Sequence, residues 1–209
     1  MSGSYAIGDV RPDEWTDVAR LVGDAVPNAI LSHLGSAFGA RFYRAIAAQS
    51  YACAFAAHDG AGRLLGVIIG SQDQGRSYAE AVGSQRLRLA LAANVRLLAP
   101  ATIRWVLRGL FGKKGPARAE HRPEAELLVI TVRPEARGTG LAEALVKALE
   151  SFLRARGHRG PYVIRTEAAN ERANRFYARI GARLACEDTF HGRRINEWHK
   201  DLPAEGAAP

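Results

Sequence analysis

The sequence predicts one α/β domain, and three observations support that prediction. Strand-like apolar runs alternate with amphipathic helical segments over most of the 209 residues. A glycine-rich turn joins one such run, 127–132, to a helix that begins near Leu141. Runs at 51–57 and 63–71 flank Asp59-Gly60-Ala61-Gly62 and predict a hairpin. The chain is therefore α/β in its middle, with hairpins at its edges.

The remaining elements follow in chain order. A first strand is expected near residues 5–10. Pro12-Asp13-Glu14-Trp15 then opens a helix, because proline and acidic residues favour a first turn. A second helix is expected from about residue 35 to residue 49. After the central strand at 126–132, the sequence predicts a helix ending near Gly157, a strand at 162–166, a helix from Asn170 to Gly181 and strands at 182–187 and 194–200.

Composition limits the class of protein. With 47% hydrophobic residues, the chain is long enough for one domain over residues 1–204, followed by a tail at 205–209. The sequence contains no apolar run of about 18 residues and no basic-apolar leader, so the expected location is the cytoplasm. Cys53 and Cys186 stand alone, and the six histidines form no ligand pair. No metal site is therefore expected.

Residues 76–118 form an unusually basic segment. No acidic residue lies between Glu80 and Glu120, whereas the whole chain has 29 Lys and Arg against 21 Asp and Glu. Apolar residues there repeat at helical spacing, which predicts an amphipathic helical insertion between the third and fourth strands. The insertion either packs on the core with solvated arginines or meets a membrane or an anionic acceptor. Nucleic acid is not expected, because few aromatic residues are available for base stacking.

Arg137-Gly138-Thr139-Gly140-Leu141-Ala142 is the most informative stretch. Glycine lets the turn approach a ligand closely, and the first N–H groups of the following helix point at an anion. The pattern predicts a pyrophosphate site. A P-loop would need Lys-Ser or Lys-Thr at Leu141-Ala142, and a dinucleotide fingerprint would need a small residue at Glu143. A tight turn without a ligand is the remaining alternative.

A second motif lies downstream of this turn and contains Asn170, Ala173, Phe176, Tyr177 and Gly181. Together the two motifs resemble the GNAT superfamily of acetyl-CoA-dependent N-acyltransferases. Val132-Arg133-Pro134, followed by residues 137–142, is similar to the cofactor motif of that family. The family's N-x-x-A-x-x-F-Y-x-x-x-G segment is matched by Asn170, Ala173, Phe176, Tyr177 and Gly181. One departure is Glu135, where the family often has Gln or Arg.

The resemblance implies a fold, a co-substrate and a set of binding residues. The implied fold is a mixed, mostly antiparallel central sheet flanked by helices, and acetyl-CoA is the co-substrate. Backbone groups of Ile130 and Val132 would face the pantetheine and the thioester oxygen, and Asn170 would bind the cofactor or only cap its helix. The pyrophosphate would be held by Arg137, Gly138, Thr139, Gly140, Leu141 and Ala142.

Acetyl transfer to an amine needs a base and a proton donor for the departing thiolate. Glu126, Leu128, Ile130 and Val132 are expected to share one strand face, which makes Glu126 the candidate general base. The alternative is a charged residue at the exposed end of a strand. By resemblance, Tyr177 would protonate the thiolate, and the alternative is a tyrosine of the core.

The acceptor is the least defined part of the site. Ser32, His33, His191 and Arg194 lie in segments that flank the acceptor groove in such folds. Because arginine suits a phosphate or carboxylate, the expected acceptor is a small anionic amine such as an amino-sugar nucleotide. The alternatives are a catalytically silent acyl-CoA-binding or membrane-associated module and a protein N-acetyltransferase. A homodimer and a peripheral membrane contact through 76–118 are further hypotheses.

Overall fold

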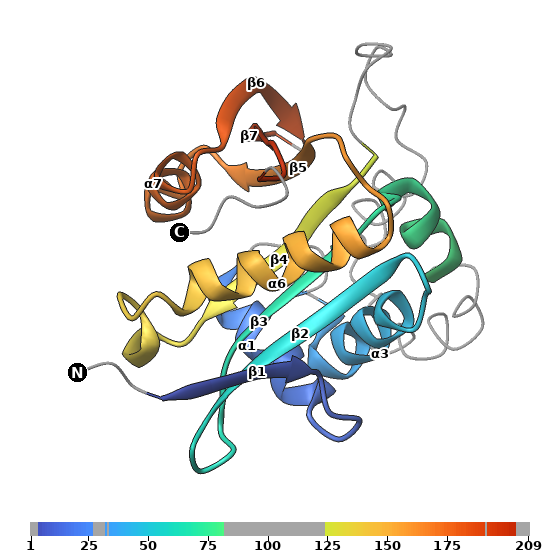
Figure 1. The fold of residues 1–209 in the computed structure, drawn as a ribbon, viewed down its shortest axis with the longest axis vertical. Coiled ribbons are helices and arrows are strands. Elements are labelled where there is room, and N and C mark those ends of the chain that lie inside the picture. Colours follow the sequence, from blue (N-terminus) through green and yellow to red (C-terminus); the bar gives the residue numbers. More distant parts are fainter. Residues whose placement is uncertain (1–3, 27–31, 33, 82–123, 191, 204–209) are drawn as a thin grey trace.

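The computed structural model describes residues 4–26, 32, 34–81, 124–190 and 192–203 (Figure 1). Within these ranges, seven strands form one sheet in the order β1-β2-β3-β4-β5-β7-β6. The strands are β1 (Tyr5–Asp9), β2 (Ala52–Asp59), β3 (Leu64–Ser71), β4 (Glu126–Val132), β5 (Tyr162–Glu167), β6 (Arg183–Phe190) and β7 (Arg193–Lys200). Only β4 and β5 pair in parallel, and the other neighbouring strands are antiparallel. The predicted mixed, mostly antiparallel sheet is therefore confirmed.

Helices cover both faces of the sheet (Figure 1). One apolar cluster joins the sheet to α1 (Trp15–Ala25) and α3 (Ser36–Ala47), and another joins it to α6 (Leu141–Ala155). A shorter helix, α7 (Glu171–Arg179), contacts β6, and the 3-10 turn η1 (Pro134–Ala136) precedes α6. Of the predicted insertion at 76–118, the structure describes only residues 76–81, which belong to a helical run at 74–81. The rest of that prediction and the tail at 205–209 lie outside the described residues.

β3 is the centre of the core, and all eight of its residues are buried. Ile68 belongs to the cluster under α6, and its neighbours Val67 and Ile69 belong to the cluster under α1 and α3. Because successive side chains of a strand point to opposite faces, β3 contributes to both clusters. Gly70 lies under α6, where any side chain would collide with Leu149, so glycine lets the helix lie close to the strand.

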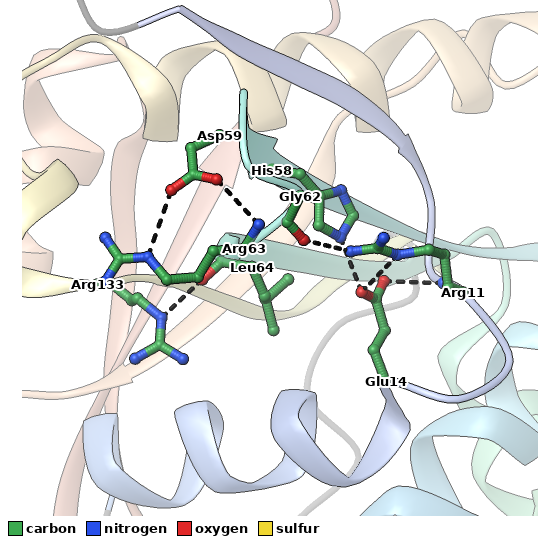
Figure 2. A network of polar contacts seen from close by, with 8 residues as sticks. All are labelled: Arg11, Glu14, His58, Asp59, Gly62, Arg63, Leu64 and Arg133. Atoms are coloured by element: carbon green, nitrogen blue, oxygen red, sulfur yellow. Dashed lines mark hydrogen bonds and ion pairs between the residues drawn. The ribbon is translucent and has the colours of Figure 1, made fainter.

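A polar network joins the segment before α1 to the β2–β3 hairpin (Figure 2). The buried Glu14 carboxylate accepts hydrogen bonds from the backbone N–H of Arg11 at 2.8 Å and from Arg11 Nε at 3.1 Å. Its Oε2 lies 2.7 Å from His58 Nε2 in β2. Burial opposes ionisation of Glu14, but these hydrogen bonds outweigh it and hold its pKa below the ordinary value.

Candidate active site

β4 and β5 separate almost as soon as they meet. Their parallel ladder has two residue pairs, Glu126↔Val163 and Leu127↔Ile164. β4 continues to Val132 and β5 continues to Glu167 without further pairing between them, while β5 pairs with β7 along its whole length on its other edge. In Figure 1, β5, β7 and β6 stand apart from the half of the sheet that contains β1 to β4. We call the diverging stretch beyond Leu127 and Ile164 the fork.

Side chains along the fork are more accessible than the rest of the central sheet. Leu128, Val129, Ile130 and Val132 of β4 are half-buried, whereas every residue of the neighbouring β3 is buried. A central strand is normally covered on both sides by its neighbours, so this exposure follows from the departure of β5. On the side of the fork, β4 therefore presents unladdered backbone groups and apolar surface to a ligand.

β4 carries a β-bulge where the fork begins. On the β3 side, Gly70 pairs with Leu127 and Ile69 pairs with Val129, so Leu128 has no register partner on β3. One extra residue in a strand reverses which face the later side chains point to. The expectation that Glu126, Ile130 and Val132 share one face was therefore wrong. Ile130 and Val132 pack against the cluster under α6, whereas Leu128 packs against the cluster under α1 and α3.

The glycine turn places the N-terminus of α6 after the open end of β4. Gly138 and Gly140 have φ values of 76° and 82°, which favour glycine strongly over other residues. The predicted start of the helix at Leu141 is observed, and no side chain caps it. Its first backbone hydrogen bond runs from Ala144 N–H to Gly140 O, so the preceding N–H groups have no bond within the helix. We call residues 137–142 the cradle.

Two arginines add positive charge beside the cradle. Arg137 donates a hydrogen bond from Nε to Val132 O at 3.2 Å, which anchors its side chain to the end of β4. Partial burial and the nearby cation of Arg172 in α7 lower the pKa of Arg137, while Glu135 acts in the opposite direction. Arg137 still carries its charge at neutral pH, because an arginine pKa lies far above 7. An anion placed here would relieve the repulsion between two cations.

α7 starts after the open end of β5, so two helix N-termini follow the two arms of the fork. Asn170 is the N-cap residue and accepts a hydrogen bond from Ala173 N–H at 3.1 Å, which confirms the predicted cap. Arg179 of α7 and Glu143 of α6 form an ion pair at 2.7 Å that links the two helices. The positive ends of both helix dipoles therefore lie at the edge of the sheet where β4 and β5 end and the fork is open.

Tyr177 belongs to the core that joins α7 to the sheet. Its side chain is 6% exposed, and its ring centroid lies 5.6 Å from that of Phe176 and 6.5 Å from that of Trp198 in β7. Burial raises the pKa of Tyr177 above its ordinary value, so the phenol keeps its proton at neutral pH. The residue therefore packs as a core tyrosine in this structure, whatever further role its hydroxyl has.

Glu126 is buried at 6% exposure, so it is not a charge at the exposed end of a strand. Its Oε2 lies 3.0 Å from Arg165 Nη1 in β5, and its Oε1 lies 3.3 Å from the same nitrogen. Arg165 also binds Glu197 of β7, with Nε to Oε2 at 3.2 Å. The candidate base is thus part of an ion-pair network that crosses the junction of the two half-sheets.

Ser32 and Arg194, the two predicted acceptor residues that the structure describes, lie in different parts of the fold. Ser32 lines a hollow of about 310 Å³ between α1 and α3, together with Asp24, Ser36 and Tyr43. Its hydroxyl donates to Val26 O at 2.7 Å. Arg194 of β7 is exposed and pairs with Glu187 of β6. His33 and His191 lie outside the described residues.

Sequence reasoning missed two polar residues that organise this region. Arg165 interrupts the apolar run of β5, and that interruption was a signal that could have been used. Asn174 is the other, because its Nδ2 donates to Glu167 O, Ala168 O and Asn170 O at 2.9–3.2 Å. Its Oδ1 accepts from Asn196 Nδ2 and Trp198 Nε1, both at 3.0 Å. Through these contacts α7 is fixed to the end of β5 and to the middle of β7.

The described ranges contain neither a candidate metal-binding cluster nor a candidate membrane-spanning helix. No group of three or more His, Cys, Asp and Glu side chains within these ranges could hold a metal ion. No helix there has the length and apolar character needed to cross a membrane.

Comparisons with known proteins identify the family. A model of the Acetyltransferase (GNAT) family matches residues 30–182, and the chain belongs to this family. It is therefore an acetyl-CoA-dependent acyltransferase, as the two sequence motifs predicted. A search of curated protein sequences found no match.

Solved structures support the same fold. SsHAT is 21% identical, with 96% of this chain and 99% of that chain aligned and a TM-score of 0.60. Arabidopsis thaliana NAA60, solved with a bisubstrate analogue, is 12% identical over 97% and 100% of the two chains, with a TM-score of 0.60. The ribosomal-protein-S18-alanine N-acetyltransferase from Escherichia coli is 13% identical over 98% and 97%, with a TM-score of 0.55. At these identities the likeness concerns the fold alone.

Proposed function

We propose that this enzyme moves the acetyl group of acetyl-CoA to the primary amine of a small anionic acceptor, such as an amino-sugar nucleotide. The observation that carries the proposal is the position of the cradle beyond the open end of the fork. A single extended ligand with a phosphorylated end and an apolar arm fits this arrangement. Coenzyme A has such a shape, with its pyrophosphate at one end and its pantetheine at the other.

The cradle and the fork would bind different parts of acetyl-CoA. The amides of Gly138, Thr139, Gly140, Leu141 and Ala142 would hold the pyrophosphate, with Arg137 supplying charge. The unladdered backbone of β4 at Ile130 and Val132 would bind the pantetheine amides and the thioester oxygen, much as a neighbouring strand would. Asn170 would contribute through its Nδ2, because its Oδ1 already caps α7.

The reaction would be a direct attack on the thioester. The amine nitrogen forms a bond to the acetyl carbonyl carbon, the C–S bond breaks, and coenzyme A leaves as a thiolate. Glu126, directly or through water, would take the proton that the amine loses, and Tyr177 would donate its phenolic hydrogen to the thiolate. Tyr177 keeps its proton at neutral pH, as a donor must, although the burial that raises its pKa also makes it a weaker acid. The ion pair of Glu126 with Arg165 bears on the assignment of the base, because the amine must compete with a guanidinium for that carboxylate.

Arginines near the sheet junction support an anionic acceptor. Arg165 lies beside Glu126, and Arg193 at the start of β7 pairs with Glu167 at the end of β5 with 2.7 Å between Nη1 and Oε1. A phosphate or carboxylate of the acceptor could exchange with the Glu167 carboxylate at Arg193. The proposed location is the cytoplasm. The homodimer and the membrane contact through 76–118 stay predictions, because most of that segment lies outside the described residues.

The competing function is a silent acyl-CoA-binding module. It is favoured by the engagement of Glu126 with Arg165 and by the burial of Tyr177 in the core. A protein N-acetyltransferase is the other alternative, and one structural neighbour, the ribosomal-protein-S18-alanine N-acetyltransferase from Escherichia coli, carries such a name. That likeness has 13% identity, so it assigns no acceptor to this chain.

The test is release of free thiol from acetyl-CoA in the presence of three acceptor panels. The panels are amino-sugar nucleotides and other anionic amines, cationic aminoglycosides, and peptides with free N-termini. We expect turnover with the anionic panel and a KM for acetyl-CoA at least about tenfold higher in a Gly140→Asp variant, which weakens the cradle. Turnover with peptides alone would replace the proposed acceptor class. Binding of acetyl-CoA without turnover on any panel would establish the silent module.

A further inference from the structure

We propose that Arg165 is a positioning residue that fixes the Glu126 carboxylate at the point where β4 and β5 diverge. The proposal rests on the proposed function, in which Glu126 accepts the proton of the amine. It assigns the geometry of that carboxylate to a side chain of the neighbouring strand.

The first step is the contact between the two side chains. Arg165 Nη1 donates to both carboxylate oxygens of Glu126, at 3.0 and 3.3 Å. The Glu126 side chain is 7% exposed and the Arg165 side chain is 25% exposed, so water screens this pair little. A carboxylate held through both oxygens loses the rotation that a single contact would leave it.

The second step is the anchoring of Arg165 from the far side. Arg165 and Glu197 are register partners on β5 and β7, and Arg165 Nε lies 3.2 Å from Glu197 Oε2. The other oxygen of Glu197 lies 3.1 Å from His199 Nε2 on the same strand. One guanidinium therefore bridges carboxylates from β4 and β7 while its own strand lies between them. Arginine suits this role because its planar fork offers several donors, whereas lysine presents a single point charge.

The third step is the place of the network in the sheet. Glu126 and Leu127 are the only β4 residues paired with β5, so little backbone pairing sets the relation between the two half-sheets at this point. Tyr162 and Ile164 of β5 pack under α6, and Arg165, at an odd distance from them, points to the other face. Glu126 and Arg165 thus meet on the sheet face opposite α6, two residues before the bulge at Leu128.

Removing Arg165 would take away the cation that contacts both the Glu126 and the Glu197 carboxylates. The buried Glu126 carboxylate would lose the contact to both of its oxygens, so it would rotate away or take up a proton. A displacement of about 1 Å in a catalytic group can cost about 10²-fold in rate. The predicted defect is therefore in turnover, not in the binding of acetyl-CoA at the cradle.

The test compares Arg165→Lys, Arg165→Met, Glu197→Gln and Glu126→Gln, with Arg183→Lys as the matched control. Arg183 is an exposed arginine of β6 that pairs with Asp201. With the best acceptor of the panel, we expect kcat to fall about 10²-fold in Arg165→Met and about tenfold in Arg165→Lys. The KM for acetyl-CoA should stay within about twofold in both, and Arg183→Lys should match the wild type.

A double-mutant cycle tests whether Glu197 acts only through Arg165. Glu197→Gln alone should lower kcat severalfold, and it should not lower kcat further in the Arg165→Met background. A crystal structure of the Arg165→Met variant gives a reading that needs no acceptor. We expect the Glu126 carboxylate to be displaced there, and an unmoved Glu126 would overturn the proposal.

The failures of the two proposals are distinguishable. If Glu126→Gln loses turnover while both Arg165 variants keep the wild-type kcat, Glu126 is the base and Arg165 does not position it. If Glu126→Gln keeps the wild-type kcat, the base assignment fails and the positioning role fails with it. A rise in the KM for acetyl-CoA that accounts for the whole effect of Arg165→Met would show that Arg165 shapes the fork instead.

Discussion

Arg63 of the β2–β3 hairpin and Glu135, two residues before the cradle, form an ion pair with 3.2 Å between Nη1 and Oε1. The neighbouring Arg133 adds two hydrogen bonds to the start of β3. Its backbone N–H donates to Leu65 O at 2.8 Å, and its Nε donates to Leu64 O at 2.6 Å (Figure 2). The hairpin thus holds the segment between β4 and α6. Glu135, where the family often has Gln or Arg, forms its ion pair with Arg63 of this hairpin.

Glu135→Gln is expected to strengthen the binding of coenzyme A up to about fivefold at low salt. The substitution removes a negative charge that acts on Arg137, the cation of the cradle. Stability should change little, because the pair with Arg63 is about half exposed on both sides. Calorimetric titration at low and high salt measures the effect, which salt should reduce. Asp201→Asn removes an exposed acid on another part of the sheet as the control, and weaker binding in Glu135→Gln alone would contradict the prediction.

Gly140→Asp is expected to weaken coenzyme A binding by at least about tenfold, or about 1.4 kcal/mol. The substitution puts a side chain at a φ of 82° and a negative charge at the N-terminus of α6. No atom lies within 4 Å of the position that its Cβ would occupy, so steric collision is not the cause. Gly157 has the same open surroundings and a φ of 80° beyond the other end of α6, so Gly157→Asp carries the backbone strain alone. Equal affinities of the two variants would remove the cradle from the proposal.

The succession of strands and helices along the chain, and the residues at which two helices begin, could be predicted from local signals. Leu141 begins α6 and Asn170 caps α7, because glycine turns and side-chain caps act within a few residues. The bulge at Leu128 could not be predicted, since residues 127–132 are almost all apolar and an apolar run fits a regular strand whichever face each side chain takes. Without the bulge, Glu126 was expected to share a face with Ile130 and Val132.

The partner of Glu126 was hidden for a different reason. Arg165 is 39 residues away in sequence, and the contact exists only because β4 and β5 meet as parallel neighbours. The sequence identified Glu126 as a chemically suitable carboxylate, but it could not show that Arg165 forms an ion pair with this carboxylate. Likewise, Tyr177 was placed in the right motif, but its burial against Trp198 depends on how β7 packs against α7.

Glu14 is expected to make the fold less stable in acid. Its folded pKa lies below the ordinary value, so its contribution is fully present above the unfolded pKa of about 4.3 and is lost as the pH falls through the folded value. Arg11 and His58 are the groups that stabilise the carboxylate (Figure 2). Urea unfolding at pH 7 and pH 3 should show a smaller difference in Glu14→Gln than in the wild type. Asp17→Asn, in an exposed pair with Arg20, is the control, and an unchanged pH dependence in Glu14→Gln would refute this role.

Tyr177→Phe is expected to lower kcat by roughly 10²-fold while the affinity for acetyl-CoA and the fold persist. Phenylalanine keeps the ring that packs between Phe176 and Trp198, so the variant loses only the hydroxyl that would donate to the thiolate. Tyr162→Phe is the matched control, because that hydroxyl donates to the buried Glu150 at 3.0 Å. It should lower the melting temperature and leave kcat nearly intact. If Tyr177→Phe behaves like Tyr162→Phe, with a confirmed acceptor and with chemistry rate-limiting, then Tyr177 is a core residue and the proton for the thiolate comes from another group.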